Sequence, residues 1–232
     1  MQSSSILRGK LKQLPGLRST YYLGIVLQQM LRDQWKQPSS FDEVFAESED
    51  PWESTSESEK ERFRVTLDVL AAGESHYATA VELGCAEGIF TERIAPRCEY
   101  LLALDFSEVA LERARDRLSH RRNVEFRRWD MRREPLDGKF DLVVAMGVIT
   151  SLYRPGDVRR ICESVINAVN PGGLLLFSDV RQSPVFESAW WGPLMLRGGG
   201  QIRNYLTDHG SLEVLKSADT KSHVFALYRR RA

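Results

Sequence analysis

A tight run of small residues follows a short apolar segment: Ala80-Val81-Glu82-Leu83-Gly84-Cys85-Ala86-Glu87-Gly88. Gly84, Ala86 and Gly88 carry little or no side chain, so the backbone of such a turn can approach a ligand closely. Glu82 stands at the end of the apolar segment, where open α/β sheets bind their ligands. The spacing predicts a buried strand, a ligand-binding turn and the start of a helix, and favours this over a turn that serves packing alone.

The same spacing excludes two phosphate-binding loops. The three glycine positions of a dinucleotide fingerprint would hold Gly84, Ala86 and Ile89, and a P-loop requires Gly-Lys-Ser/Thr, whereas Ile89 and Phe90 follow Gly88. A second apolar segment, 100–104, ends in Asp105 about twenty residues on, where an acid accepts hydrogen bonds from a ribose diol. A glycine turn without phosphate chemistry, together with a ribose acid, predicts a nucleoside ligand, of which S-adenosylmethionine is the common one.

These segments resemble the motifs of class I S-adenosylmethionine-dependent methyltransferases over about residues 78 to 180. Besides the glycine loop and Asp105, the matching segments are Trp129-Asp130-Met131, the strand Phe140–Met146 and the turn Asn170-Pro171-Gly172-Gly173. The chain departs from the family at Ala86, where glycine is usual; a methyl group is tolerated there if φ is negative.

The resemblance implies a fold and a cofactor site. The fold is α/β: a doubly wound, Rossmann-like, seven-stranded and mostly parallel sheet that ends in an antiparallel hairpin. The residues implied to bind S-adenosylmethionine are Glu82, Gly84, Cys85, Ala86, Gly88, Phe90, Asp105, Phe106, Asp130, Met131, Met146, Gly147 and Val148.

A second resemblance lies before the glycine loop. The pattern Phe41, Asp50-Pro51-Trp52, Glu59, Arg62-Phe63 and Thr66-Leu67 is similar to the N-terminal region of the nodulation protein S group. Those are small N-methyltransferases that act on a chitooligosaccharide amine. The resemblance implies that Trp52 covers the cofactor and that Arg62 helps to hold it. The group has an aromatic residue where this chain has Ser58, so the resemblance does not define the acceptor side of the lid.

Hydrophobic periodicity and turn signals predict the secondary structure around these residues. Apolar residues recur with helical spacing over 20–35 and 57–72, and Ser107 is a good N-cap for a helix over 107–119. Further elements are predicted as a strand over 123–129, a helix over 155–170, a short helix around 202–207, and a hairpin of 212–216 with 224–228. We expect a basic flexible arm over 1–19, N-terminal helices and a cofactor lid over 20–75, and a methyltransferase domain over 76–232 with a substrate insert at about 181–200.

The amino-acid composition limits which classes of binding partner are expected. The 32 Lys and Arg residues balance the 32 Asp and Glu residues, so no bulk field favours nucleic acid. Three scattered cysteines suggest reduced thiols in the cytoplasm, and no apolar run reaches transmembrane length. No pair of residues has metal-ligand spacing, so no metal is expected. We expect a small-molecule substrate, and the sequence leaves a homodimer open.

Methyl transfer mainly requires an acceptor aligned with the S–CH3 bond. A hydroxyl acceptor also needs a base, and the candidates are Asp179, Tyr153 and His209, with His223 as a structural residue. Trp190 and Trp191, beside a glycine run, could stack on a sugar ring. We therefore expect a saccharide or glycoside, methylated on oxygen or nitrogen. The alternatives are methylation of another small metabolite and a non-catalytic module that binds S-adenosylmethionine.

Overall fold

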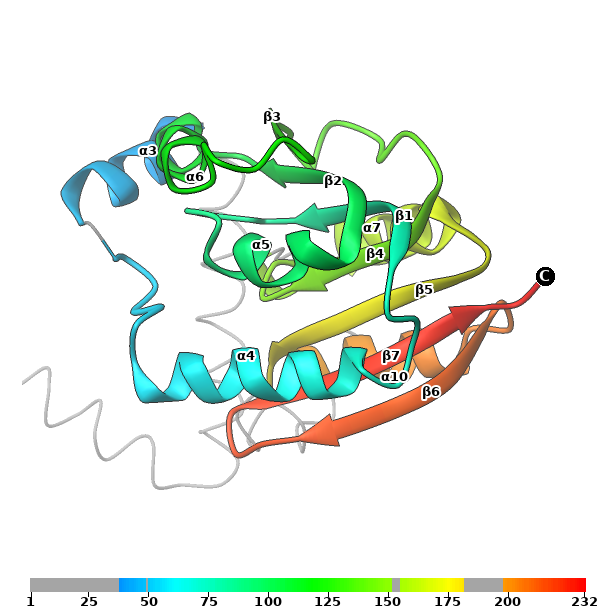
Figure 1. Ribbon diagram of the computed structural model, residues 1–232. Coiled ribbons are helices and arrows are strands. Elements are labelled where there is room, and N and C mark those ends of the chain that lie inside the picture. Colours follow the sequence, from blue (N-terminus) through cyan, green and yellow to red (C-terminus); the bar gives the residue numbers. More distant parts are fainter. Residues whose placement is uncertain (1–37, 49, 152–154, 182–197) are drawn as a thin grey trace, which may run out of the picture.

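A single seven-stranded sheet forms the centre of the protein in the computed structural model, which describes residues 38–48, 50–151, 155–181 and 198–232 (Figure 1). The strand order is β3-β2-β1-β4-β5-β7-β6, and β7 runs in the direction opposite to the other six strands. The strands are β1 (Tyr77–Leu83), β2 (Cys98–Asp105), β3 (Val124–Arg128), β4 (Phe140–Met146), β5 (Val169–Val180), β6 (Leu212–Asp219) and β7 (His223–Arg230). The predicted doubly wound sheet with an antiparallel C-terminal hairpin is confirmed.

Helices cover both faces of the sheet. They are α3 (Pro38–Glu47), α4 (Glu57–Leu70), α5 (Ile89–Ile94), α6 (Glu108–Arg117), α7 (Pro155–Ala168) and α10 (Gly199–Asp208), with the short 3-10 helices η1 (Ala95–Arg97) and η2 (Ile149–Ser151). Val165 of α7 and Leu206 of α10 pack with Val143 and Phe177 on one face. Phe63 of α4 and Ile94 of α5 pack on the other, against side chains that include Val144. Buried strand residues therefore alternate between two apolar layers.

Two helices begin with a serine N-cap, and the one at Ser107 was predicted from the sequence. Ser56 and Ser107 are the N-caps of α4 and α6, and their hydroxyls accept from the amides of Glu59 and Ala110 at 3.3 Å. Each side chain satisfies an amide that the helix leaves unpaired. Helix α3 was not predicted from the sequence. The predicted basic arm over 1–19 and the helix over 20–35 lie outside the described residues.

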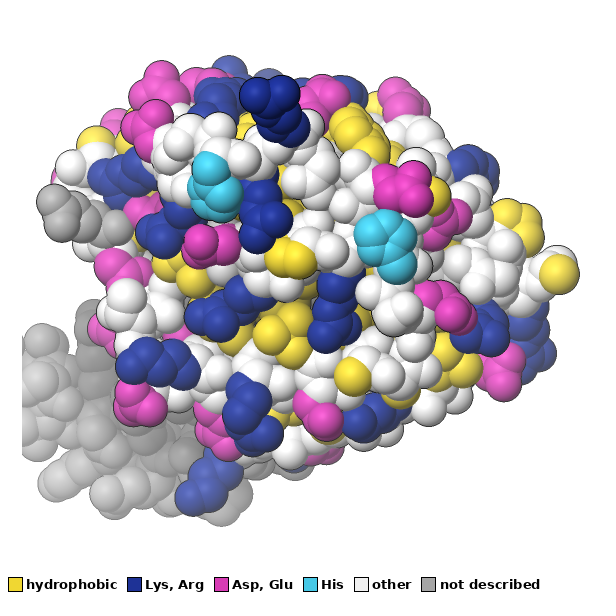
Figure 2. All heavy atoms as spheres, in the orientation of Figure 1, with side chains coloured by type: hydrophobic (Ala, Val, Ile, Leu, Met, Phe, Trp, Pro, Cys, Tyr) yellow, Lys and Arg dark blue, Asp and Glu magenta, His cyan; other side chains and the backbone are white. Residues whose placement is uncertain are grey.

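The surface carries charges of both signs. On the face shown in Figure 2, Lys and Arg side chains are interspersed with Asp and Glu side chains. No helix in the part of the chain that the structure describes is long and apolar enough to cross a membrane. Within the same described ranges, no cluster of three His, Cys, Asp or Glu side chains is placed to hold a metal ion.

Candidate functional site

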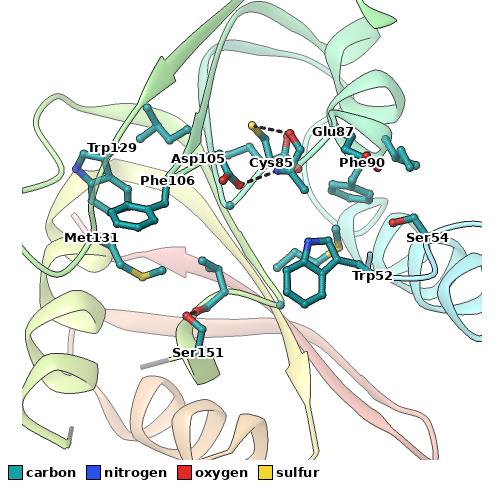
Figure 3. A pocket seen from close by; sticks show the side chains of 18 of the residues that line it. Trp52, Ser54, Cys85, Glu87, Phe90, Asp105, Phe106, Trp129, Met131 and Ser151 are labelled. Atoms are coloured by element: carbon teal, nitrogen blue, oxygen red, sulfur yellow. Dashed lines mark hydrogen bonds between the residues drawn. The ribbon is translucent and has the colours of Figure 1, made fainter. Parts of the chain in front are cut away.

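A cavity of about 320 Å³ opens at the carboxyl ends of β1, β2 and β4. Its volume lies at the lower end of the roughly 300–1,000 Å³ typical of small-molecule sites. Figure 3 shows Asp105 between Phe106 and Trp129 on one side and Trp52 on the other. Of the fifteen residues predicted to bind a cofactor, all but Gly88 line this cavity.

The glycine loop forms one wall, and each small residue serves a different purpose. Gly84 has φ +69°, and a Cβ there would lie 2.8 Å from a methyl carbon of Val148. Gly88 has φ +76°. A Cβ there would lie 2.9 Å from Leu118, the C-cap residue of α6, so this glycine permits the loop to pack closely on α6 and does not face the cavity. Ala86 has φ +47°. The condition under which a methyl group would be tolerated, a negative φ, is therefore not met, and Ala86 is held in a left-handed conformation that is strained for L-residues.

Asp105 ends β2 and is tied to the loop. Its Oδ2 accepts from the amide of Ala86 at 2.9 Å, and its Oδ1 accepts from the amide of Ser107 at 2.9 Å. Burial raises the pKa of Asp105, and these amide hydrogen bonds oppose the rise. A carboxylate has about four acceptor sites, so Asp105 can still accept from a ligand hydroxyl.

Phe106, Trp129 and Met131 build an apolar slot at one end of the cavity. The indole of Trp129 donates to the carbonyl of Pro135 at 3.1 Å, which fixes its ring. The guanidinium of Arg132 lies 4.8 Å from the centre of the Phe106 ring and donates to Asp130 Oδ1 at 3.1 Å. A planar, uncharged base fits such a slot, since aromatic faces offer stacking.

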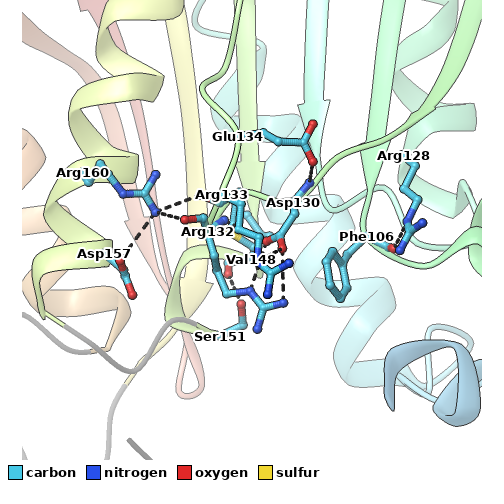
Figure 4. A network of polar contacts seen from close by, with 11 residues as sticks. Phe106, Arg128, Asp130, Arg132, Arg133, Glu134, Val148, Ser151, Asp157 and Arg160 are labelled. Carbon is cyan, nitrogen blue, oxygen red and sulfur yellow. Dashed lines mark hydrogen bonds and ion pairs between the residues drawn. The ribbon is translucent and has the colours of Figure 1, made fainter. Parts of the chain in front are cut away.

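The loop after β3 that carries this slot is held by a polar network (Figure 4). Arg160 of α7 donates to the carbonyls of Met131 at 3.1 Å and Arg132 at 2.9 Å. Asp130 accepts from the Arg132 amide at 2.9 Å, and its own amide donates to Glu134 at 3.0 Å. Arg132 and Arg160 therefore hold this loop in place through its own backbone and Asp130.

Glu82 is a buried carboxyl at the end of β1, only 2% exposed. Burial raises its pKa to about 7, although the hydroxyl of Thr91 donates to it at 2.6 Å; the charge of Asp105 adds to the rise. A cation brought into the cavity beside Glu82 would favour the ionised form.

Two side chains from the N-terminal segment cover the cavity from the opposite side. Trp52 is 48% exposed and meets Phe45 edge-on, with ring centres 6.1 Å apart. Arg62 of α4 is ion-paired with Glu59 and lies 5.3 Å from the centre of the Phe63 ring. Its Nε is buried without a hydrogen-bond partner in the described structure, so a ligand acceptor could satisfy it.

The segment after β4 closes the far end. Gly147 has φ +69°, and a Cβ there would lie 2.6 Å from Arg62 Nη1, so glycine allows the guanidinium to approach. Thr150, in η2, donates its amide to Asp179 Oδ2 at 3.0 Å and its hydroxyl to Asp179 Oδ1. Met146, Val148 and Ser151 complete this end of the cavity.

The predicted bases are not brought together at the cavity. Asp179 is fully buried, is satisfied by Thr150 and by the amide of Val180 at 2.8 Å, and does not line the cavity. His209 caps α10 and lies 3.6 Å from Glu163, away from the lining residues. Neither side chain lines the cavity, so the described structure gives no support for either as a base, and the assignment stays a prediction. Tyr153, Trp190 and Trp191 lie outside the described residues.

His223 has a structural environment. It is 6% exposed, and its Nδ1 lies 2.9 Å from the hydroxyl of Ser222. Burial lowers its pKa to about 4, with a further contribution from the charge of Arg62.

Besides Trp129, several lining residues were not among those predicted to bind the cofactor. They are Phe45, Ser54, Phe63, Glu87, Ile89, Leu104, Arg132, Thr150 and Ser151. Glu87 lies inside the glycine loop, so its place could have been inferred from Gly84 and Gly88. Phe45 and Thr150 reach the cavity through tertiary packing, for which the local sequence gives no signal.

The chain is similar to a family of known proteins. A family model described as "Nodulation protein S (NodS)" matches residues 42–195. Nodulation protein S of Rhizobium tropici is 25% identical over 183 residues, which cover 70% of this chain and 77% of that protein. The Bradyrhizobium diazoefficiens protein of the same name is 31% identical over 57% of this chain, and the match spans 64% of that protein.

A solved structure shares the fold. It is the N-methyltransferase NodS from Bradyrhizobium japonicum WM9 in complex with S-adenosyl-l-homocysteine, with a TM-score of 0.72 and 24% identity. The superposition covers 85% of this chain and all of that chain.

Proposed function

This chain belongs to the nodulation protein S family of S-adenosylmethionine-dependent methyltransferases, and from that premise we propose that its acceptor is the free amine of a small saccharide. The observation that carries the methyltransferase assignment is the convergence of the glycine loop, Asp105 and the N-terminal lid on one cavity. The acceptor class is our own inference, and it rests on the family and on the carboxylates of the site.

The residues present fit S-adenosylmethionine. The cavity offers an apolar slot for a base at Phe106, Trp129 and Met131, and a carboxylate for a diol at Asp105. Arg62 has a buried Nε that lacks a partner among the described residues, and we propose that it holds the carboxylate of the methionine moiety. We propose that Glu82 stabilises the ammonium of the same moiety, because ionised Glu82 would then gain a cation.

When bound, S-adenosylmethionine supplies a sulfonium methyl group that a lone pair can attack in line while the C–S electron pair returns to sulfur. The chain's residues orient the two reactants. We propose that Gly84 and Gly147 bring the backbone close to the ligand, and that Trp52 and Phe45 exclude water from above. An amine acceptor arrives neutral and releases its extra proton after transfer, so no strong base is required.

The carboxylates of the cavity support an amine over a hydroxyl acceptor. Among the described lining residues, Glu82, Glu87, Asp105 and Asp130 each already accept from Thr91, Arg113, the Ala86 amide and Arg132, respectively. We assign Glu82 and Asp105 to the cofactor, and Glu87 and Asp130 are held by arginines, so none of these carboxylates is proposed as a general base for a hydroxyl. We propose the cytoplasm as the compartment, which is supported by three free, buried cysteines.

A panel of acceptors tests the proposal. The purified protein is incubated with S-adenosylmethionine and with glucosamine oligosaccharides that carry one free amine, their fully N-acetylated counterparts, or the corresponding free hydroxyl. We expect S-adenosylhomocysteine release and a mass gain of one methyl group only with the free amine. Methylation of the N-acetylated compound would assign oxygen as the acceptor atom. Cofactor binding with no release on any saccharide would overturn the acceptor class.

A further inference from the structure

Arg113 of α6 joins three segments that are far apart in the sequence. Its Nη1 donates to Glu87 Oε1 at 2.7 Å and to the carbonyl of Ser48 at 3.0 Å. Its Nη2 donates to the carbonyl of Phe45 at 2.5 Å. The planar fork of a guanidinium allows several directed hydrogen bonds from one side chain, which a lysine ammonium does not reproduce.

The end of α3 needs such a donor. The last carbonyls of any helix have no partner within it, and the last turn of α3 contains no basic residue. Arg113 therefore supplies the cap from a different helix. A second contact fixes the same pair of helices, since the hydroxyl of Ser107, the N-cap of α6, donates to Asp42 Oδ1 of α3 at 2.6 Å.

Two of the residues that Arg113 binds, Glu87 and Phe45, belong to the cavity wall. Glu87 comes from the glycine loop, lines the cavity and has a side chain that is only 6% exposed. Phe45 lines the cavity from the lid and is the edge-on partner of Trp52. A carboxylate so buried requires a charged partner, so the ion pair links the loop directly to the end of α3.

We propose that Arg113 is a positioning residue that couples the lid over the cavity to the glycine loop, and thereby sets how long the cofactor is retained. Arg113 does not line the cavity and acts through Glu87 and the Phe45–Trp52 pair. The proposal rests on cofactor binding at this cavity and not on the nature of the acceptor.

The same helix offers a matched control. Arg115 pairs with Glu108 at 2.7 Å, but both side chains are more than two-fifths exposed, and exposed ion pairs contribute little. Arg115→Ala should therefore change neither the lid nor the retention of ligand.

The experiment measures the dissociation rate of S-adenosylhomocysteine from Arg113→Ala, Arg113→Lys and Arg115→Ala, each alone and combined with Trp52→Ala. We expect Arg113→Ala to speed dissociation about 5- to 10-fold, which is an ordinary coupling between sites. In the Trp52→Ala background, the effect of Arg113→Ala on the dissociation rate should fall below about twofold, because both residues act through the lid. Arg113→Lys keeps the charge but loses the fork, so it provides a folded variant that should also release ligand faster.

Hydrogen exchange provides a second readout that needs no ligand. Amides of residues 42–48 should exchange faster in both Arg113 variants than in wild type and in Arg115→Ala. Wild-type dissociation rates in both Arg113 variants, or an equal effect with and without Trp52, would overturn the proposed coupling. If wild type bound no S-adenosylhomocysteine at all, the cofactor assignment would fail, while unchanged exchange over 42–48 would separately refute the link to α3.

Discussion

The amide of Ala86 donates to Asp105 Oδ2 at 2.9 Å, so the tip of the glycine loop and the acid at the end of β2 form one hydrogen-bonded unit. This contact holds Ala86 at φ +47°, a conformation that glycine adopts without strain. The unit brings the loop backbone and the proposed ribose acid to the same side of the cavity.

Ala86→Gly should stabilise the protein. Left-handed backbone costs an alanine about 1–2 kcal/mol, and the greater freedom of glycine in the unfolded chain offsets about 0.5–1 kcal/mol of the relief. We expect a net gain of up to about 1 kcal/mol, or a rise in Tm of about 2–4 °C, measured by thermal melting. The control Ala71→Gly, at φ −65° and exposed, should be neutral or destabilising. An equal loss in both variants would contradict the assigned strain.

Trp52→Ala should raise the Kd for S-adenosylhomocysteine, because its ring covers the cavity and packs on Phe45. The loss of an aromatic contact worth about 0.5–1.5 kcal/mol corresponds to about a 2- to 12-fold change. Trp52→Phe should retain most of the affinity, and deletion of residues 1–19 should leave it intact. Abolished binding in the deletion variant alone would place the lid elsewhere.

Glu82→Gln should remove a pH dependence of stability in the ligand-free protein. Because the folded-state pKa of Glu82 is about 7, above the unfolded value, the folded protein binds the extra proton between about pH 4.5 and 7. Its contribution is therefore complete below about pH 4.5 and is lost as the pH rises through 7. His223, with a pKa lowered to about 4, acts in the opposite direction, since stability is lost as the pH falls from about 6.5 to 4.

The two contributions are separated by urea unfolding of wild type and Glu82→Gln at pH 5 and pH 8. The free energy of unfolding of wild type should decrease relative to that of the variant as the pH rises, by on the order of 3 kcal/mol. Glu92→Gln, on the exposed side of α5, should track wild type. Parallel curves for wild type and Glu82→Gln would show that Glu82 titrates normally.

Trp190→Ala and Trp191→Ala should raise the KM for a saccharide acceptor while they leave cofactor affinity nearly unchanged. Both residues lie outside the described structure, so this prediction rests on the sequence. A stacking loss of about 0.5–1.5 kcal/mol corresponds to about a 2- to 12-fold rise in KM. Unchanged kinetics in both variants, or activity on tRNA with none on saccharides, would refute the stacking platform.

The sheet could be predicted because its buried strands are continuous apolar runs, as in Leu101–Leu104 and Leu142–Met146, and because Asp105 ends a strand at the ligand edge. Helix α3 was missed because its stability depends on tertiary contacts, with Asp42 bound by Ser107 and its last turn capped by Arg113. Asp179 and His209 were chosen as candidate bases by residue type alone. Residue type cannot reveal that Thr150 already donates hydrogen bonds to Asp179, or that His209 lies beside Glu163.

Calorimetric titration of S-adenosylhomocysteine into wild type and Asp105→Ala tests the central claim most directly. We expect a Kd of about micromolar for wild type and a loss of about 10-fold or more in the variant, since a hydrogen bond to a charged group is worth about 1.5–3 kcal/mol. Asp116→Ala, at an exposed position of α6, should bind like wild type, and Asp105→Asn should keep the loop contact with partial affinity. Equal affinity in wild type and Asp105→Ala would contradict the ribose assignment, and with it the place of the cofactor in this cavity.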